Sequence, residues 1–279
     1  MGINERIPGL HHSNTTHAYS NWHMDEIELR SYLLATAHGM SSWFKDKEIE
    51  AEKAVAHLDP ESMHGDEAYT HFMDKVGIFW ETYWYQLASA VVKDAFTLFE
   101  VFLEESADGT LRRYKSGLIK FGTEDSWRMN ECDQFFSDYL GFSVLTRQIE
   151  DIQWIRNKLA HLRDELRTAE GKASFAERLN RLSVSSDETP EEKELQLSHF
   201  EFGRQLAFSK SLVLSPLEAW RILDIIRMHA DEIATALSSI EYGPMSTAAL
   251  EELRAGNPVR SRDARLIRIP EAPTTVTGQ

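Results

Sequence analysis

Helical periodicity constrains the fold of this chain more than any other feature of its sequence. Apolar residues recur at steps of three and four over about 25–58, 66–105, 143–168 and again after residue 215. Such spacing places them on one face of an α-helix. The stretch 66–105 is so rich in aromatic residues that it must be buried on more than one side. The sequence therefore predicts an all-α protein built from long helices.

Residues that start and stop helices divide the chain into segments. Pro60 ends the first helical region, because the residue before proline is pushed out of the α conformation. Ser215 and Pro216 begin the last helix as its N-cap and first helical residue, and Gly243-Pro244 ends it. A loose alternation over 195–214 also admits a short β-hairpin insertion. We expect a flexible N-terminal arm at 1–24, a helical segment at 25–60, a helical domain at 61–242 and a disordered tail containing arginine and proline at 243–279.

Composition and charge exclude several classes of protein. The net charge of -15 argues against a protein that coats nucleic acid non-specifically, although a local basic cleft is compatible with it. Cys132 is the only cysteine, so neither an internal disulfide nor a CxxC metal site is expected. The sequence has no apolar run of membrane-spanning length and no visible secretory signal. We therefore expect no membrane partner and a cytoplasmic location.

The helix expected at 143–168 has two chemically different sides. At about 100° per residue, Asn157 and His161 lie about 40° apart and opposite the apolar stripe. Arg156 lies between that polar side and the stripe, and Trp154 lies on the side of His161. The stripe, which is expected to face the core, consists of Ile149, Ile152, Ile155, Leu159, Leu162 and Leu166.

The string Arg156-Asn157-Lys158-Leu159-Ala160-His161 on this helix resembles the R-x4-H signature of the HEPN superfamily. The setting is also similar to that family, because a long helix ending near residue 103 precedes the motif and an amphipathic helix follows it. The resemblance covers roughly residues 66–240. It implies a HEPN-like bundle of long antiparallel helices and a metal-independent endoribonuclease, without cofactor, of the toxin–antitoxin or phage-defence type.

The chemistry of the motif suits RNA cleavage. RNA supplies its own nucleophile, the 2′-hydroxyl, so no metal-activated water is needed. An imidazole can give or take a proton near neutral pH, which suits His161 to acid–base catalysis. The guanidinium of Arg156 matches phosphate oxygens. Asn157 can donate to phosphate or orient either neighbour. The expected catalytic residues are Arg156, Asn157 and His161.

The same helix face predicts a dimer interface. An outward-facing Trp154 beside Asn157 and His161 is poorly explained on a solvated helix and better explained against a second protein surface. Catalytic HEPN proteins work as dimers with two motif helices facing each other across a cleft, so the resemblance points the same way. We expect a two-fold homodimer with these three residues at its interface.

A basic stretch follows the turn signal Asp108-Gly109, which is expected to end the second helix. Its four cations are a solvated loop under one interpretation. Under the other they guide the RNA backbone, together with Lys158, toward the cleft. These expected RNA-binding residues of the stretch are Arg112, Arg113, Lys115 and Lys120.

Two functions remain open at this point: the endoribonuclease and a non-catalytic HEPN-like dimerisation or adaptor module. The intact pair of Arg156 and His161 favours the first, and the acidic charge favours the second. Arg156 also has a structural interpretation, because it could pair with Glu150, Asp151 or Asp164 at helical spacing. An antitoxin or activating partner is also expected if the chain is a toxin.

The histidines near the N-terminus lack the spacing of a metal site, and no metal is expected.

Overall fold

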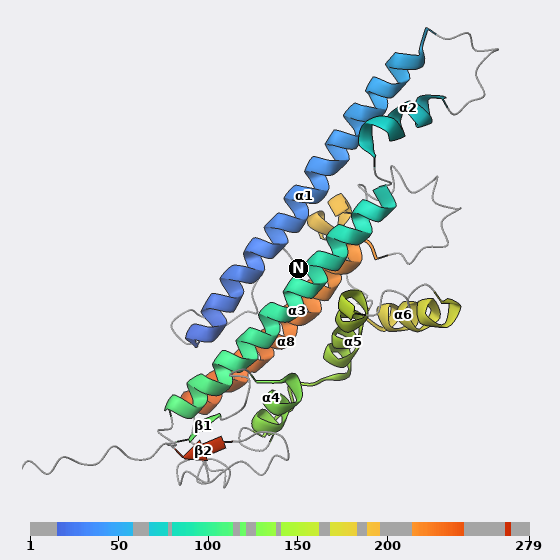
Figure 1. Cartoon of the computed structure of the whole chain (residues 1–279). Helices are drawn as coiled ribbons and strands as arrows, with labels where there is room; N and C mark the ends of the chain where they lie inside the picture. Colours follow the sequence, from blue (N-terminus) through green and yellow to red (C-terminus); the bar gives the residue numbers. More distant parts are fainter. Residues whose placement is uncertain are drawn as a thin grey trace, which may run out of the picture. The chain divides into compact units, whose positions relative to one another are not determined.

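The computed structural model describes residues 16–57, 67–77, 80–113, 118–120, 127–137, 141–161, 168–182, 189–195, 214–242 and 266–268. These residues are predominantly helical, which confirms the all-α class (Figure 1). The elements are α1 (His17–Val55), α2 (Glu67–Val76), α3 (Trp80–Arg113), β1 (Leu118–Lys120), α4 (Met129–Phe135), α5 (Arg147–His161), α6 (Ala169–Arg181), a short helix at 190–195, α8 (Pro216–Tyr242) and β2 (Leu266–Arg268).

The two short strands do not form the hairpin that the sequence suggested. β1 pairs with β2 in an antiparallel ribbon, with Leu118 opposite Arg268. β2 lies inside the expected disordered tail, so that expectation is wrong for residues 266–268. Most of the segment 195–214, where the hairpin was expected, lies outside the described residues.

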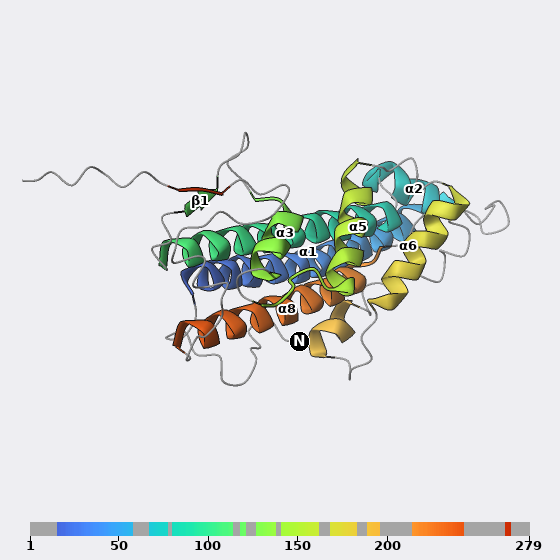
Figure 2. The ribbon, with the colours of Figure 1, turned by 90° about the horizontal axis from the view of Figure 1, so that it is seen from below.

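The chain divides into two compact units, each of which takes a part of α1, α3, α5 and α8. The first includes Ile27–Ala95 and Trp154–Asp224, and the second includes Phe96–Gln153 and Ile225–Gln279 together with Arg6–Glu26. This division does not follow the expected boundary at residue 60. In each unit, the parts of α1, α3 and α8 lie side by side (Figures 1 and 2).

α1 begins earlier than expected. The hydroxyl of Thr16 accepts a hydrogen bond from the backbone N–H of Tyr19 at 3.2 Å, as an N-cap does. Tyr19 and Trp22 are buried, and their rings lie 6.2 and 5.6 Å from that of Phe102 on α3. The prediction of a flexible arm is therefore wrong for residues 17–24, because aromatic burial against α3 holds this segment in the helix.

The expected long helix at 66–105 is two helices. Gly77 separates α2 from α3 with a φ of +69°, and its N–H donates to the carbonyl of Met73 at 2.8 Å. This left-handed ending is the one that glycine favours. The second boundary also differs, since α3 continues through Gly109 to Arg113. Asp108 does not end the helix; its carboxylate accepts a hydrogen bond from the indole of Trp127 at 3.0 Å.

α8 begins and ends where the sequence predicted. The N–H of Glu218 donates to the Ser215 hydroxyl at 3.2 Å, and the N–H of Ser215 donates to the Glu218 carboxylate at 2.6 Å. This reciprocal capping box satisfies two donors that the first turn would otherwise leave unpaired. Trp220 and Leu223 are fully buried on the core side of the helix.

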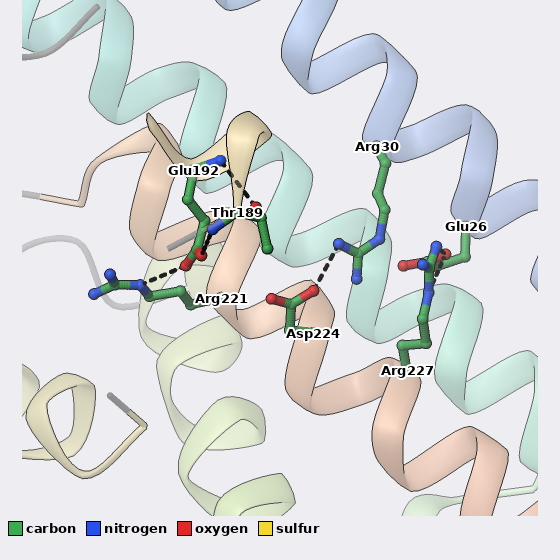
Figure 3. Close-up of polar contacts among 7 residues, drawn as sticks. All are labelled: Glu26, Arg30, Thr189, Glu192, Arg221, Asp224 and Arg227. Carbon is green, nitrogen blue, oxygen red and sulfur yellow. Dashed lines mark hydrogen bonds and ion pairs between the residues drawn. The ribbon is translucent and has the colours of Figure 1, made fainter. Parts of the chain in front are cut away.

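Buried charges connect α1 with α8 (Figure 3). In the first unit, Arg30 donates to Asp224 at 2.7 Å and its guanidinium lies over the ring of Trp220, 4.6 Å from its centroid. In the second unit, Arg227 binds Glu26, and the hydroxyl of Tyr19 donates to Asp231. Partners further along α8 meet residues nearer the start of α1, so these two helices are antiparallel.

Within the part of the chain that the structure describes, no helix combines the length and the apolar character needed to cross a membrane.

Candidate functional site

α5 has the two sides that its sequence predicted. The apolar stripe is fully buried over the residues that the structure describes, which confirms that it faces the core. Leu162 and Leu166, at the end of the expected stripe, lie outside the described residues. The stripe anchors the helix and thereby fixes which residues point away from the core. The buried members are Ile149, Ile152, Ile155 and Leu159.

The motif residues lie on the other side of α5. Asn157 and His161 are exposed, and Arg156 is half-buried. The guanidinium of Arg156 donates a hydrogen bond to the side-chain oxygen of Asn157 at 3.0 Å. Contact between these neighbours orients the guanidinium, which is one of the two roles considered for Asn157. The arrangement presents a forked cation, an amide and an imidazole on one solvent-accessible part of the helix.

Trp154 has a partner within the chain. Its ring lies 6.5 Å from that of Phe175 on α6, and the guanidinium of Arg178 lies 4.6 Å from its centroid. The ammonium of Lys158 lies 5.3 Å from the same centroid. From the sequence alone, Trp154 is expected at a dimer interface because no other surface that could cover it is apparent. α6 supplies such a surface, so Trp154 no longer argues for a second chain.

α6 was not predicted from the sequence. Thr168 caps it by accepting a hydrogen bond from the N–H of Gly171 at 3.0 Å, and Phe175 is buried at 1% exposure. Arg178 is one helical turn beyond Phe175 and therefore shares its side of the helix. The spacing of Phe175, Leu179 and Leu182 after a capping threonine was the signal that could have revealed this helix.

A second polar cluster at the N-terminal end of α5 was also not predicted. Nε2 of His229 on α8 lies 3.1 Å from Oγ1 of Thr146 and 3.3 Å from Oε1 of Gln148. Its Nδ1 lies 3.4 Å from a carboxylate oxygen of Glu232. Burial lowers the pKa of His229, and the charge and hydrogen bond of Glu232 offset only part of this effect. The cluster joins the imidazole of His229 to the residue that precedes α5.

The hydroxyl of Thr146 also caps α5. It accepts a hydrogen bond from the N–H of Ile149 at 3.4 Å, and the Thr146 carbonyl accepts from the N–H of Glu150 at 2.9 Å. His229 therefore contacts the group that begins the motif helix. This contact gives the cluster a structural role in positioning α5.

The basic stretch is not one loop. Arg112 and Arg113 belong to the last turn of α3, and Lys120 belongs to β1. Lys115 lies outside the described residues, as do the side chains of the other three cations. Contact between these residues and RNA stays a prediction.

Among the described residues, no three or more His, Cys, Asp or Glu side chains are grouped as they would be to hold a metal ion. Of the N-terminal histidines, His17 is exposed at the start of α1, whereas His23 is buried and stacked on Tyr19. His11 and His12 lie outside the described residues.

Comparisons of the chain with models of protein families, with curated proteins and with solved structures give no match. The HEPN resemblance therefore depends on the motif from Arg156 to His161 and on its place within the helical architecture.

Proposed function

We propose that this chain is a metal-independent endoribonuclease of the HEPN type, cytoplasmic, with a toxin or phage-defence role. One observation carries the proposal. Asn157 and His161 are exposed four residues apart on α5, with Arg156 held by Asn157, whereas the opposite stripe of the helix is buried. Because the buried stripe fixes the helix, the polar residues on its other side are held in position for catalysis.

The reaction requires only groups that the motif and the RNA supply. The 2′-oxygen attacks the neighbouring phosphorus while the bond from phosphorus to the 5′-oxygen breaks. One imidazole takes the proton of the 2′-hydroxyl, and a protonated imidazole gives one to the leaving 5′-oxygen. Arg156 stabilises the charge that gathers on the phosphate oxygens. The products are a 2′,3′-cyclic phosphate and a 5′-hydroxyl.

Two imidazoles at one phosphate imply two copies of His161. The proposal therefore includes a two-fold homodimer in which the motif helices face each other, with Asn157 and His161 at the interface. The exposure of both side chains supports this part of the proposal. Sedimentation at tens of micromolar protein is expected to show a dimer, and a monomer under these conditions would contradict it.

Cleavage assays test the chemistry directly. Wild-type protein in excess EDTA is expected to cleave tRNA, rRNA or mRNA from a total preparation, to leave 2′,3′-cyclic ends and to spare DNA. His161→Ala should lower the rate about 10²–10⁴-fold, because a proton-transfer group is lost. His38→Ala is a matched control, since His38 is also exposed on a helix. Unchanged cleavage by His161→Ala would refute the proposal.

Arg156 provides a second test. Arg156→Ala should reduce the rate to a degree comparable with His161→Ala. Arg156→Lys should restore little of it, because a point charge cannot replace a planar fork that contacts two oxygens. Full activity of Arg156→Lys would show that only the charge matters.

A non-catalytic adaptor or dimerisation module is the second candidate, and the net charge of -15 favours it because an acidic chain repels RNA. A dimer that cleaves no RNA would favour this alternative. In the toxin role, an antitoxin or an activating partner would control the nuclease, and co-purification from the native host would identify it.

A further inference from the structure

Two cations meet at one aromatic ring beside the motif. Lys158 reaches the ring of Trp154 from the next turn of α5, and Arg178 reaches it from α6. Each distance is within the range of an attractive contact between a cation and an aromatic ring. The indole therefore fixes two positive charges near each other, although like charges repel.

The backbone around the ring explains why these cations are held in place. Phe175 is buried against Trp154 and fixes the rotation of α6, which directs Arg178 toward the ring one turn later. Lys158 is three residues before His161, so the two share one side of α5. Lys158 thus lies one helical turn before the expected proton-transfer group, and both cations are half-buried, with part of each side chain accessible.

The local charge differs in sign from that of the whole chain. α5 and α6 each contain three Lys or Arg residues and two Asp or Glu residues, whereas the chain carries a net charge of -15. Of the helices that the structure describes, α5 and α6 therefore repel an approaching polyanion least.

We propose that Lys158 and Arg178 form a phosphate-binding site for single-stranded RNA, which holds the strand so that a neighbouring phosphodiester reaches His161. The inference rests on the proposed nuclease function and adds Arg178, a residue outside the motif, as a positioning residue. The ring of Trp154 holds both cations in place, because each of them contacts its face. Phosphates suit this site because two convergent cations match the negative charge of the RNA backbone.

The salt dependence of RNA binding tests the site. Fluorescein-labelled poly(U) is titrated with the His161→Ala protein, which binds without cutting, at several salt concentrations. Arg178→Gln and Lys158→Gln are each expected to reduce the slope of log Kd against log salt by about 0.7 for the lost phosphate contact. Arg181→Gln is the matched control on the same helix, because Arg181 is paired with Glu177 at 2.6 Å. Its slope should equal that of the parent.

Cleavage kinetics supply a second readout. Arg178→Gln should raise KM several-fold with little change in kcat, because a positioning contact to a flanking phosphate adds uniform binding. Arg178→Lys should recover part of the affinity. Equal slopes for Arg178→Gln and Arg181→Gln, or no binding of poly(U) at low salt, would overturn the site. Cleavage that does not depend on His161 would overturn the catalytic proposal instead, and the slopes would still report whether the cations bind phosphate.

Discussion

The basic residues of this chain occur in two contrasting settings. Between α1 and α8, Arg30 and Arg227 are fully buried, and each donates to a carboxylate on the other helix. On α5 and α6, Arg156, Lys158 and Arg178 are half-buried, and the contacts described above are with an amide and an indole. The same types of side chain therefore lie in different environments in the two regions.

The difference follows from the energetics of burial. A fully buried guanidinium loses its hydration, and only a fixed carboxylate makes that loss tolerable. Such pairs specify which helix packs against which. Because their charges cancel, they leave no net charge for a ligand. A half-buried cation keeps part of its hydration and remains accessible from the solvent. The α1–α8 pairs therefore belong to the architecture, whereas the cations of α5 and α6 are candidates for binding.

The largest expected effect is on the buried pair. Arg227→Met should lower the free energy of unfolding by about 3–5 kcal/mol, because Glu26 is left as a buried charge without its guanidinium. Denaturant titration followed by circular dichroism measures this change. The control is the double variant Glu26→Leu with Arg227→Met, which should recover most of the loss because both charges are removed. A single variant as stable as the wild type would show that this pair contributes no more to stability than the half-buried cations of α5 and α6.

The next effect compares the helix starts of the same two regions. Ser215 begins α8 in a buried, reciprocal capping box, and Thr168 begins α6 at an exposed position with one capping bond. Ser215→Ala should cost about 1 kcal/mol of unfolding free energy, and Thr168→Ala should cost less. Thermal or denaturant unfolding measures both. A larger loss of unfolding free energy for Thr168→Ala than for Ser215→Ala would contradict this comparison.

Features fixed by neighbouring residues could be predicted from the sequence. The start of α8 needs only Ser215, Pro216 and Glu218, and the buried stripe of α5 needs only the helical repeat. The place of His161 opposite that stripe followed from the same repeat. Local signals of this kind act within one or two turns of a helix, so no knowledge of the rest of the fold is required.

Features fixed by distant residues could not be predicted. Residues 17–24 join α1 because Tyr19 and Trp22 pack on Phe102, far along the chain. The contact of Trp154 with Phe175 could not be predicted either, because it depends on how α6 packs against α5 and not on the local signals that begin and pattern α6. In both cases tertiary packing fixes a contact that local patterning does not report.

A smaller effect on stability is expected at His229. Its environment is intermediate between those of the buried α1–α8 pairs and the α5 and α6 cations, because it is half-buried and has polar partners. Its pKa is lowered in the folded chain, so the unfolded chain binds the proton more tightly. The associated stability is present above the unfolded pKa of about 6.5 and is lost as the pH falls below it. His229→Gln should therefore lose less stability than the wild type on acidification from neutral pH.

Denaturant titrations at several pH values test this prediction. Glutamine retains hydrogen-bonding groups toward Thr146 but does not titrate. The difference between variant and wild type therefore reports the protonation of His229. Equal pH dependence in variant and wild type would mean that other histidines account for the acid sensitivity.

The smallest change in stability is expected at Arg156, where the contrast between the regions is sharpest. Arg156 is half-buried and donates to Asn157, which is itself exposed. Water can replace the polar contacts of a half-exposed guanidinium, and the stripe that anchors α5 is untouched, so Arg156→Met should change the unfolding free energy by no more than about 0.5 kcal/mol. The same substitution at Arg227 should cost several times as much, although it removes the same charge and adds the same side chain. RNA cleavage should show the reverse order, with Arg156→Met inactive and any folded Arg227→Met protein still active. Loss of stability at Arg156 on the scale of Arg227 would make the polar side of α5 structural, and the nuclease proposal would lose the observation that carries it.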